Sequence, residues 1–220
     1  MIVPKNMFVI WIGNKPAPLH LINTWKEKHP DWKFRIIDND EFYGTKWQNQ
    51  SLIDVYLSEN RYPGVADVIR YELLFREGGF SPPADSLCLH NVEELMDDNN
   101  EAYGVYENEK VRAGLVSPLY ACVKNSSFAF DLINNLPKIP PKINGRSKAP
   151  WQVTGNLYMK KMIEEKKPSK LTIWESFRFN PIHHTGLRYE GSEKVYAVQQ
   201  WGATSEAGIG IGKYEWGTNK

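Results

Sequence analysis

The stretch "ADVIRYELLFREGGFSPPADSLCL", residues 66–89, decides the fold class of this 220-residue chain. Its first part is apolar on most sides and predicts a deeply packed helix, which Gly78 and Gly79 end. Two prolines then stiffen the approach to a lone carboxylate, Asp85, and an apolar run after it predicts a strand. A packed helix followed by a strand favours an α/β domain. Asp85 is then either an ordinary turn residue or part of a site.

The residues before this stretch repeat the same alternation of strands and helices. "MFVIWIG" (7–13) is a short apolar run closed by glycine, which is typical of a central parallel strand. Residues 16–30 predict a helix, 31–38 a second strand and 51–60 a second helix. Residues 1–95 therefore form the first half of an α/β domain of the nucleotide-binding type, whose ligands bind beyond the carboxyl ends of the strands. Trp11 and Asp38 fall at such ends.

The second half, residues 96–220, contains shorter elements. Short pieces without an assigned type lie at 101–107 and 113–124, strands are expected at 170–176 and 194–203, and helices near 126–136 and over 151–167. The proline-rich connector 136–150 is too short to separate two independent domains. We therefore predict one domain over residues 1–220, with a mixed, mostly parallel sheet flanked by helices.

Charge and composition exclude several classes of protein. A formal net charge of +1 makes no electrostatic case for a nucleic-acid partner. The longest apolar run, Met7–Ile12, is too short for a signal sequence or a membrane span. Cys88 and Cys122 lie in apolar runs and are expected to be buried free thiols of a reducing compartment. We expect a cytoplasmic monomer without a membrane span.

Asp67 and Arg70 stand three positions apart, so they share one face of the predicted helix. They could form an internal ion pair. Alternatively, they could face a polyhydroxyl ligand, with the carboxylate accepting hydrogen bonds from sugar hydroxyls and the guanidinium donating them. Asp85 alone supplies too few oxygens for a metal such as Mn²⁺ or Mg²⁺, but a bound diphosphate could supply others.

Taken together, these elements resemble the core motif of the DXD-containing sugar transferases of glycosyltransferase family 32 and of the clostridial glucosylating toxins. The matching residues are Ala66-Asp67, Arg70-Tyr71, Gly78-Gly79 and Asp85, the last at the position of the second aspartate. "VPKNMFVIWIG" (3–13) and "WKEKHPDWKFRIIDND" (25–40) are similar to the family's opening segments. The resemblance covers residues 1–95 well and later residues thinly. It implies a GT-A-type nucleotide-diphospho-sugar transferase domain, with 1–95 binding the nucleotide sugar and 96–220 completing the site and binding the acceptor.

One position departs from the family pattern, because Pro83 stands where the first aspartate of Asp-x-Asp is expected. In the family the second aspartate is the direct metal ligand, and the first mainly holds the ribose and the donor sugar. The retained Asp85 therefore keeps the implied ligand, whereas donor affinity, sugar preference and turnover are all in question. The two prolines could order the loop by lowering the entropy lost on folding.

The resemblance also implies roles for individual residues. Asp85, Arg70 and Asp67 would be the catalytic set, with Asp85 bridging Mn²⁺ (or Mg²⁺) to the diphosphate and Arg70 contacting phosphate. Trp11 would stack on the uracil ring, although it could equally be a core residue at a strand end. The complete set implied for binding the UDP-sugar donor is Trp11, Ile12, Gly13, Asp67, Arg70, Ala84 and Asp85.

Residues of the second half would complete the metal shell. In "YAVQQWGATS" (196–205), Gln199 stands where the family has a histidine, and an amide oxygen is a weaker ligand. His183, beside His184 in "FRFNPIHHTG" (177–186), is the alternative, although a surface histidine pair is as good a reading. The implied metal ligands are thus Asp85 with Gln199 and His183. Residues 154–156 ("TGN") would line the acceptor side.

The sequence thus predicts a retaining, metal-assisted glycosyltransferase that moves a sugar from a UDP-sugar to a glycan or glycoprotein acceptor. The chain shows no residue that would force a double displacement. The alternative is a catalytically impaired nucleotide-sugar or glycan-binding module of the same fold, which the Pro83 and Gln199 departures favour. A Rossmann domain with unrelated chemistry ranks last, because no Gly-x-Gly-x-x-Gly follows the first strand.

Overall fold

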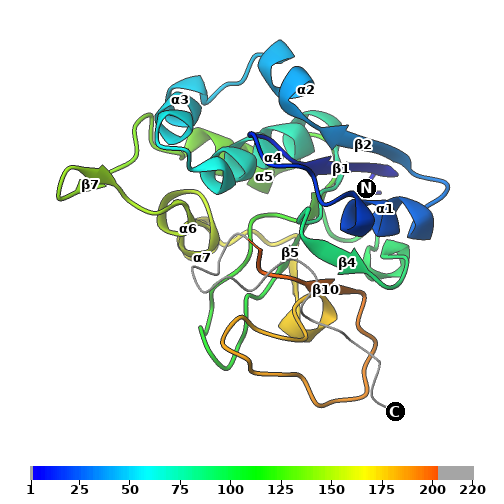
Figure 1. Ribbon diagram of the computed structural model, residues 1–220. Helices are drawn as coiled ribbons and strands as arrows, with labels where there is room; N and C mark the ends of the chain where they lie inside the picture. The colour runs from blue at the N-terminus through cyan, green and yellow to red at the C-terminus, as the bar shows by residue number, and fades with distance from the viewer. Residues whose placement is uncertain (1, 203–220) are drawn as a thin grey trace.

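A six-stranded sheet forms the centre of the computed structural model, which describes residues 2–202 (Figure 1). The strand order is β2-β1-β3-β6-β5-β9, and β6 runs against both of its neighbours while the other five strands share one direction. The predicted α/β class with a mixed, mostly parallel sheet is confirmed. The strands are β1 (Asn6–Ile10), β2 (Lys33–Ile37), β3 (Gly79–Phe80), β5 (Ala102–Val105), β6 (Ala121–Cys122) and β9 (Leu171–Trp174).

Helices cover both faces of this sheet because side chains alternate along the strands. Phe8 and Ile10 of β1 face the larger core, to which α3, α4, α5 and α7 contribute. Met7 faces the second core, which contains Trp25 of α1. The helices are α1 (Leu19–Lys28), α2 (Asn39–Gly44), α3 (Gln50–Ser58), α4 (Tyr62–Glu77), α5 (Ser127–Asn134), α6 (Pro150–Val153) and α7 (Asn156–Lys166), with 3-10 turns at Glu93–Leu95 and Ser176–Arg178.

The two glycines after α4 allow the chain to enter the sheet directly. Both have positive φ, 67° at Gly78 and 126° at Gly79. A Cβ atom would lie 2.6 Å from the Lys124 backbone nitrogen at Gly78 and 2.3 Å from the Asn6 carbonyl oxygen at Gly79. Only glycine permits this close approach of neighbouring strands.

The strand after Asp85 differs from its predicted place. The first sheet strand after α4 is β3, whereas β4 (Ser86–Cys88) lies outside the central sheet and pairs antiparallel with β10 (Ala197–Gln199). The two prolines between them explain the change, because proline offers no backbone N–H to continue the ladder. As a consequence, Ser86 lies opposite Gln199.

Three further elements differ from the sequence expectation. Residues 151–167 form two helices separated at Thr154–Gly155 rather than one, and α2 was not predicted. The connector 136–150 contains a hairpin of β7 (Lys142–Ile143) and β8 (Arg146–Ser147). Asn144 and Gly145 at its tip have φ of 51° and 77°, as a two-residue Asn-Gly turn requires.

No helix within residues 2–202 has both the length and the apolar character needed to cross a lipid bilayer. The predicted strand at 194–203 is shorter in the structure, and its last residue lies outside the described residues, as does the end of the "YAVQQWGATS" segment.

Candidate functional site

Hydrogen bonds from two directions hold the loop that carries Asp85. The Ser86 hydroxyl donates to the Pro83 carbonyl oxygen at 2.6 Å. The indole N–H of Trp25, on α1, lies 3.1 Å from both the carbonyl and the hydroxyl oxygen of Ser86. The loop is therefore tied to a buried tryptophan, which gives Asp85 a defined position.

The carboxylate of Asp85 meets the chain just after β10. One oxygen, Oδ1, accepts a hydrogen bond from Gln199 Nε2 and the other, Oδ2, from the Gly202 backbone N–H, both at 2.8 Å. The Gln200 backbone N–H donates to the Asp85 carbonyl oxygen at 2.9 Å. The structure thus brings together Asp85 and Gln199, two of the residues predicted as metal ligands.

Arg70 is a buried cation for which no hydrogen-bond partner lies among residues 2–202. Arg70, on α4, is 8% exposed, and its Nε atom is buried and unpartnered within residues 2–202. It also forms no ion pair within 4.0 Å of a described carboxylate, although its charge acts on Asp67. Because a buried guanidinium without partners costs several kcal/mol, this position is a strong candidate for an anion-binding group.

Tyr120 is a buried residue whose pKa responds to the charges of both Arg70 and Asp85. Burial raises the pKa of Tyr120, and the charges of Arg70 and Asp85 act on it in opposite directions. The Tyr120 carbonyl oxygen accepts from the Ser81 N–H at 2.7 Å. Ser81 Oγ and Gln199 Oε1 are, like Arg70 Nε, buried with no hydrogen-bond partner in the range that the structure describes. Unpartnered polar atoms therefore gather around the Asp85 loop.

Asp67 lies on the same helix, one turn before Arg70. Its Oδ2 accepts a hydrogen bond from the Thr154 hydroxyl at 2.9 Å. Burial raises the pKa of Asp67 to about 7, while Arg70 and the Thr154 hydrogen bond oppose this shift. A Cβ atom on Gly155 would lie 3.2 Å from this carboxylate oxygen and 2.8 Å from the Trp151 backbone, so glycine is needed here.

The residues after β1 line the carboxyl end of the parallel strands. The side chain of Trp11 is half-buried, donates from Nε1 to the Lys15 carbonyl oxygen at 2.8 Å and packs in the same cluster as Ala84. Ile12 is buried in the larger core. The predicted donor-binding residues at 11–13 and at 84–85 thus come from segments that contact each other through Ala84.

Two residues near Gly13 were missed by sequence reasoning. Asn39 exchanges two hydrogen bonds with the backbone of Gly13, at 2.8 and 2.9 Å. The Tyr62 ring lies so close that a Cβ atom on Gly13 would be 3.0 Å from it. The only sequence signal was the glycine itself, whose φ of 109° requires this residue type. Asp38, at the end of β2, caps α2 by accepting from the Glu41 N–H at 3.0 Å.

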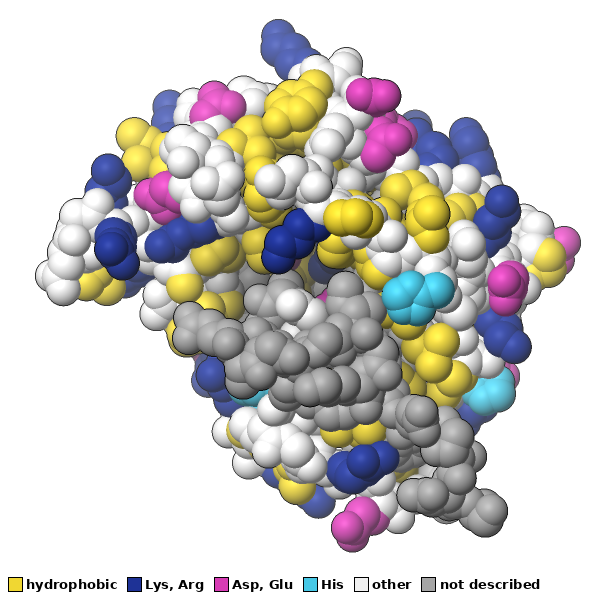
Figure 2. Space-filling view, in the orientation of Figure 1, with side chains coloured by type: hydrophobic (Ala, Val, Ile, Leu, Met, Phe, Trp, Pro, Cys, Tyr) yellow, Lys and Arg dark blue, Asp and Glu magenta, His cyan; other side chains and the backbone are white. Residues whose placement is uncertain are grey.

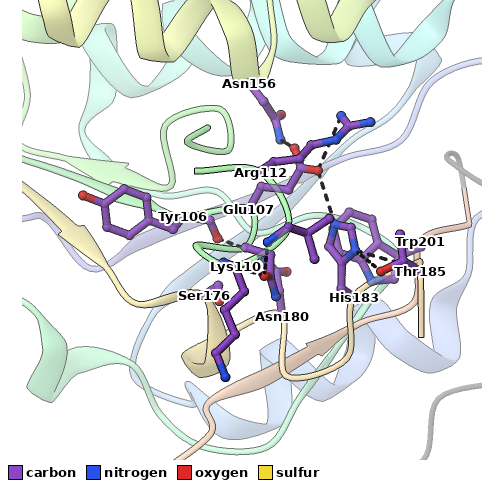
Figure 3. Close-up of polar contacts among 12 residues, drawn as sticks. Tyr106, Glu107, Lys110, Arg112, Asn156, Ser176, Asn180, His183, Thr185 and Trp201 are labelled. Atoms are coloured by element: carbon purple, nitrogen blue, oxygen red, sulfur yellow. Dashed lines mark hydrogen bonds and ion pairs between the residues drawn. The ribbon is translucent and has the colours of Figure 1, made fainter. Parts of the chain in front are cut away.

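His183 lies in a separate polar network, shown in Figure 3. The His183 side chain is fully buried, with Nδ1 at 2.8 Å from the Thr185 hydroxyl and Nε2 at 3.4 Å from Glu107 Oε1. Glu107 is also contacted by Arg112, at 3.6 Å, and by the Asn156 amide. The ring of Trp201 lies 5.2 Å from that of His183.

This network could be mistaken for a metal centre. Within residues 2–202, the group of three ligand-type side chains that converges within 4.8 Å consists of Glu107, His183 and His184, and it does not include Asp85. Because Arg112 already lies beside Glu107 and would repel a cation, we read the group as a buried hydrogen-bond network. The role of His183 as a ligand beside Asp85 stays a prediction.

The α/β fold of this chain is shared with a solved structure whose description names a glycosyltransferase. The chain superimposes on a solved structure described as "PaToxG Glycosyltransferase" with a TM-score of 0.57 and 16% sequence identity, over 75% of this chain and 70% of that chain. At this identity the likeness establishes a shared fold. No family model and no curated protein matches the sequence.

Proposed function

We propose that this protein is a glycosyltransferase that transfers a sugar from a UDP-sugar to a glycan or protein acceptor, with assistance from a divalent metal and with retention at the anomeric carbon. The buried Arg70, whose Nε has no hydrogen-bond partner in the described part of the chain, carries the proposal. It shares a helix face with Asp67 and acts electrostatically on the same tyrosine as Asp85. A diphosphate at this place would supply the anionic oxygens that the guanidinium lacks.

The donor set around Asp85 fits a hard divalent cation. Asp85 offers a carboxylate, and Gln199 offers an amide oxygen that is buried without a partner. Oxygen donors of this kind suit Mn²⁺ or Mg²⁺. When bound, such a cation would neutralise charge on the departing diphosphate. The residues of the chain would orient the donor around it.

Each further residue has a defined task under this proposal. Trp11 would stack on the uracil ring from the strand end next to Ala84. Asp67, with a pKa of about 7, is present in both protonation states at neutral pH and can donate to or accept from sugar hydroxyls. Arg70 would stabilise negative charge on the leaving group in a site shielded from water.

The acceptor is expected on the side of residues 154–156, where Thr154 contacts Asp67. Retention follows from the resemblance to family 32, in which the acceptor attacks the face that the diphosphate leaves. The anomeric carbon then has oxocarbenium character, and a neighbouring amide or carbonyl group can steady it. No protein nucleophile is required for this route.

A nucleotide-sugar-binding module without turnover is the second candidate. The observation in its favour is that both carboxylate oxygens of Asp85 already accept hydrogen bonds, from Gln199 and Gly202. A cation would have to displace at least one of these donors. Pro83, in place of the expected first aspartate, points in the same direction.

Calorimetric titration of UDP with and without Mn²⁺ tests the proposal. Native protein should bind UDP in a Mn²⁺-dependent manner, and Asp85→Ala should lose that dependence. Asp54→Ala is the matched control, because Asp54 is an exposed aspartate with one side-chain hydrogen bond from Gln50. Absence of UDP binding by the native protein would refute both candidates.

Turnover separates the two candidates. A transferase should release UDP from a UDP-sugar, by transfer or slow hydrolysis, in an amount that grows with time. A binding module would hold UDP without releasing it from the sugar. Arg70→Lys should weaken UDP binding in either case, since lysine keeps the charge but loses the planar fork of donors.

A further inference from the structure

Residues 132–163 carry six cationic side chains and no Asp or Glu, in a chain with 27 Lys/Arg and 26 Asp/Glu. Two of the six, on α7, pair with glutamates one turn later. The other four form no ion pair with any residue in the described range 2–202. They are Lys138, Lys142, Arg146 and Lys148, and they lie in or beside the β7–β8 hairpin. This segment is therefore a local concentration of unpaired positive charge.

The hairpin is attached firmly to the rest of the molecule. The Ser147 hydroxyl donates to Glu59 Oε1 at 2.6 Å, and the Arg61 guanidinium donates to the Ser147 carbonyl oxygen at 2.7 Å. Arg61 immediately precedes α4. These contacts hold the hairpin as it projects from the body at the left of Figure 1.

Strand register decides which side chains face outward. Lys142 pairs with Ser147, and Ile143 pairs with Arg146. Since Ser147 bonds to the body of the molecule, the Ile143–Arg146 pair lies on the opposite face of the hairpin. Lys142 shares the face of Ser147 but is itself exposed, so its charge also adds to the positive potential of the hairpin. Ile143 is 54% exposed there, and Ile139, just before the hairpin, is 62% exposed. Figure 2 shows dark blue side chains beside yellow ones along this edge.

We propose that this surface, formed by Lys138, Ile139, Lys142, Ile143 and Arg146, docks the protein on an anionic phospholipid membrane. The cations complement the negative potential of such a surface, and their long stems can reach phosphates while the two isoleucines enter the acyl boundary. A projecting hairpin tip with isolated aliphatic side chains suits insertion between headgroups better than it suits a flat protein interface. This inference is independent of the proposed transferase activity.

Vesicle co-sedimentation tests the proposal with the full chain. Native protein should bind vesicles of phosphatidylcholine with phosphatidylserine and leave pure phosphatidylcholine vesicles unbound. Because each cation near the surface contributes about fivefold to partitioning, Lys142→Gln with Arg146→Gln should lower binding by about 25-fold. Ile143→Ser should lower it by roughly tenfold, through lost acyl contact. High salt should weaken binding of the native protein.

Controls matched in charge and exposure lie on α1, away from the hairpin (Figure 1). Lys26→Gln with Lys28→Gln removes the same charge, and Leu19, 50% exposed, is the counterpart of Ile143 for the serine change. Both controls should bind vesicles like native protein. Equal losses in hairpin and control variants would overturn the proposal. So would binding to polyglutamate without binding to vesicles, because the surface would then serve an acidic protein.

Discussion

Removing the charge of Asp67 should stabilise the protein at neutral pH while impairing its site. Burial raises the pKa of this carboxyl from 3.8 to about 7, so the folded state holds a proton that the unfolded chain has already released. Asp67→Asn keeps an oxygen that can accept from the Thr154 hydroxyl and removes the ionisable group. The variant should therefore lack the destabilisation that the buried, ionised carboxylate of Asp67 causes.

The pH dependence has a definite sign. Below about pH 4 both states are protonated, and the native protein has its full stability from this group. As pH rises, the unfolded chain ionises first, so the free energy of unfolding falls by about 1.4 kcal/mol per pH unit until it levels off near pH 7. The whole window corresponds to about 4 kcal/mol, and Asp67→Asn should lack this loss.

Urea unfolding of both proteins from about pH 4 to about pH 8 measures the difference. The two should be equal in stability at the acid end, with the variant more stable at the alkaline end. The exposed Asp54→Asn should stay within about 0.5 kcal/mol of native protein throughout. If Asp67→Asn is instead less stable at high pH, attraction to Arg70 outweighs burial, and the internal ion pair is the correct interpretation. UDP binding by the variant should be weaker in either case.

Three further substitutions test the candidate site and the separate polar network around Glu107. Gly155→Ala should cost about 1 to 3 kcal/mol, because its Cβ would meet backbone at 2.8 Å; Gly44→Ala, with nothing within 4 Å, should be tolerated in thermal unfolding. Pro83→Asp should tighten UDP-sugar binding by calorimetry. Unchanged affinity would count against the hypothesis that the two prolines order the loop in place of the missing carboxylate. Glu107→Gln should lower the free energy of unfolding, measured with urea, by about 1 to 3 kcal/mol. The partners of Glu107, His183 among them, contact the carboxylate as donors, so the NH₂ of a glutamine would face one of these donors.

Local patterns predicted most elements correctly. The apolar run at 7–12 and the packed helix over 66–77 appear as β1 and α4, because a buried strand and a buried helix need those patterns whatever surrounds them. The predicted glycine stop is observed as well. The β7–β8 hairpin was missed although Asn144-Gly145 is a strong turn signal, since the surrounding prolines suggested an irregular connector.

Contacts between segments that lie far apart in the sequence could not be predicted from local patterns. Asp85 and Gln199 are separated by 114 positions and meet because β4 and β10 pair. Neither segment alone contains a pattern that predicts β4 outside the central sheet. His183 was predicted as a metal ligand, and in the structure its Nε2 lies 3.4 Å from Glu107 Oε1, with both side chains buried. Its role as a ligand beside Asp85 stays a prediction. A short motif cannot show which of several candidates will converge.

By itself, the sequence determined the α/β class, the helix that carries Asp67 and Arg70, and the position of Asp85 between two prolines and a strand. These depend on local periodicity and on residues with restricted backbone angles. Only the tertiary structure decided that Arg70 is buried with its Nε unpartnered among the described residues, and that burial raises the pKa of Asp67 to about 7. Burial and electrostatic energy depend on all neighbours in space, and a linear pattern does not contain those neighbours.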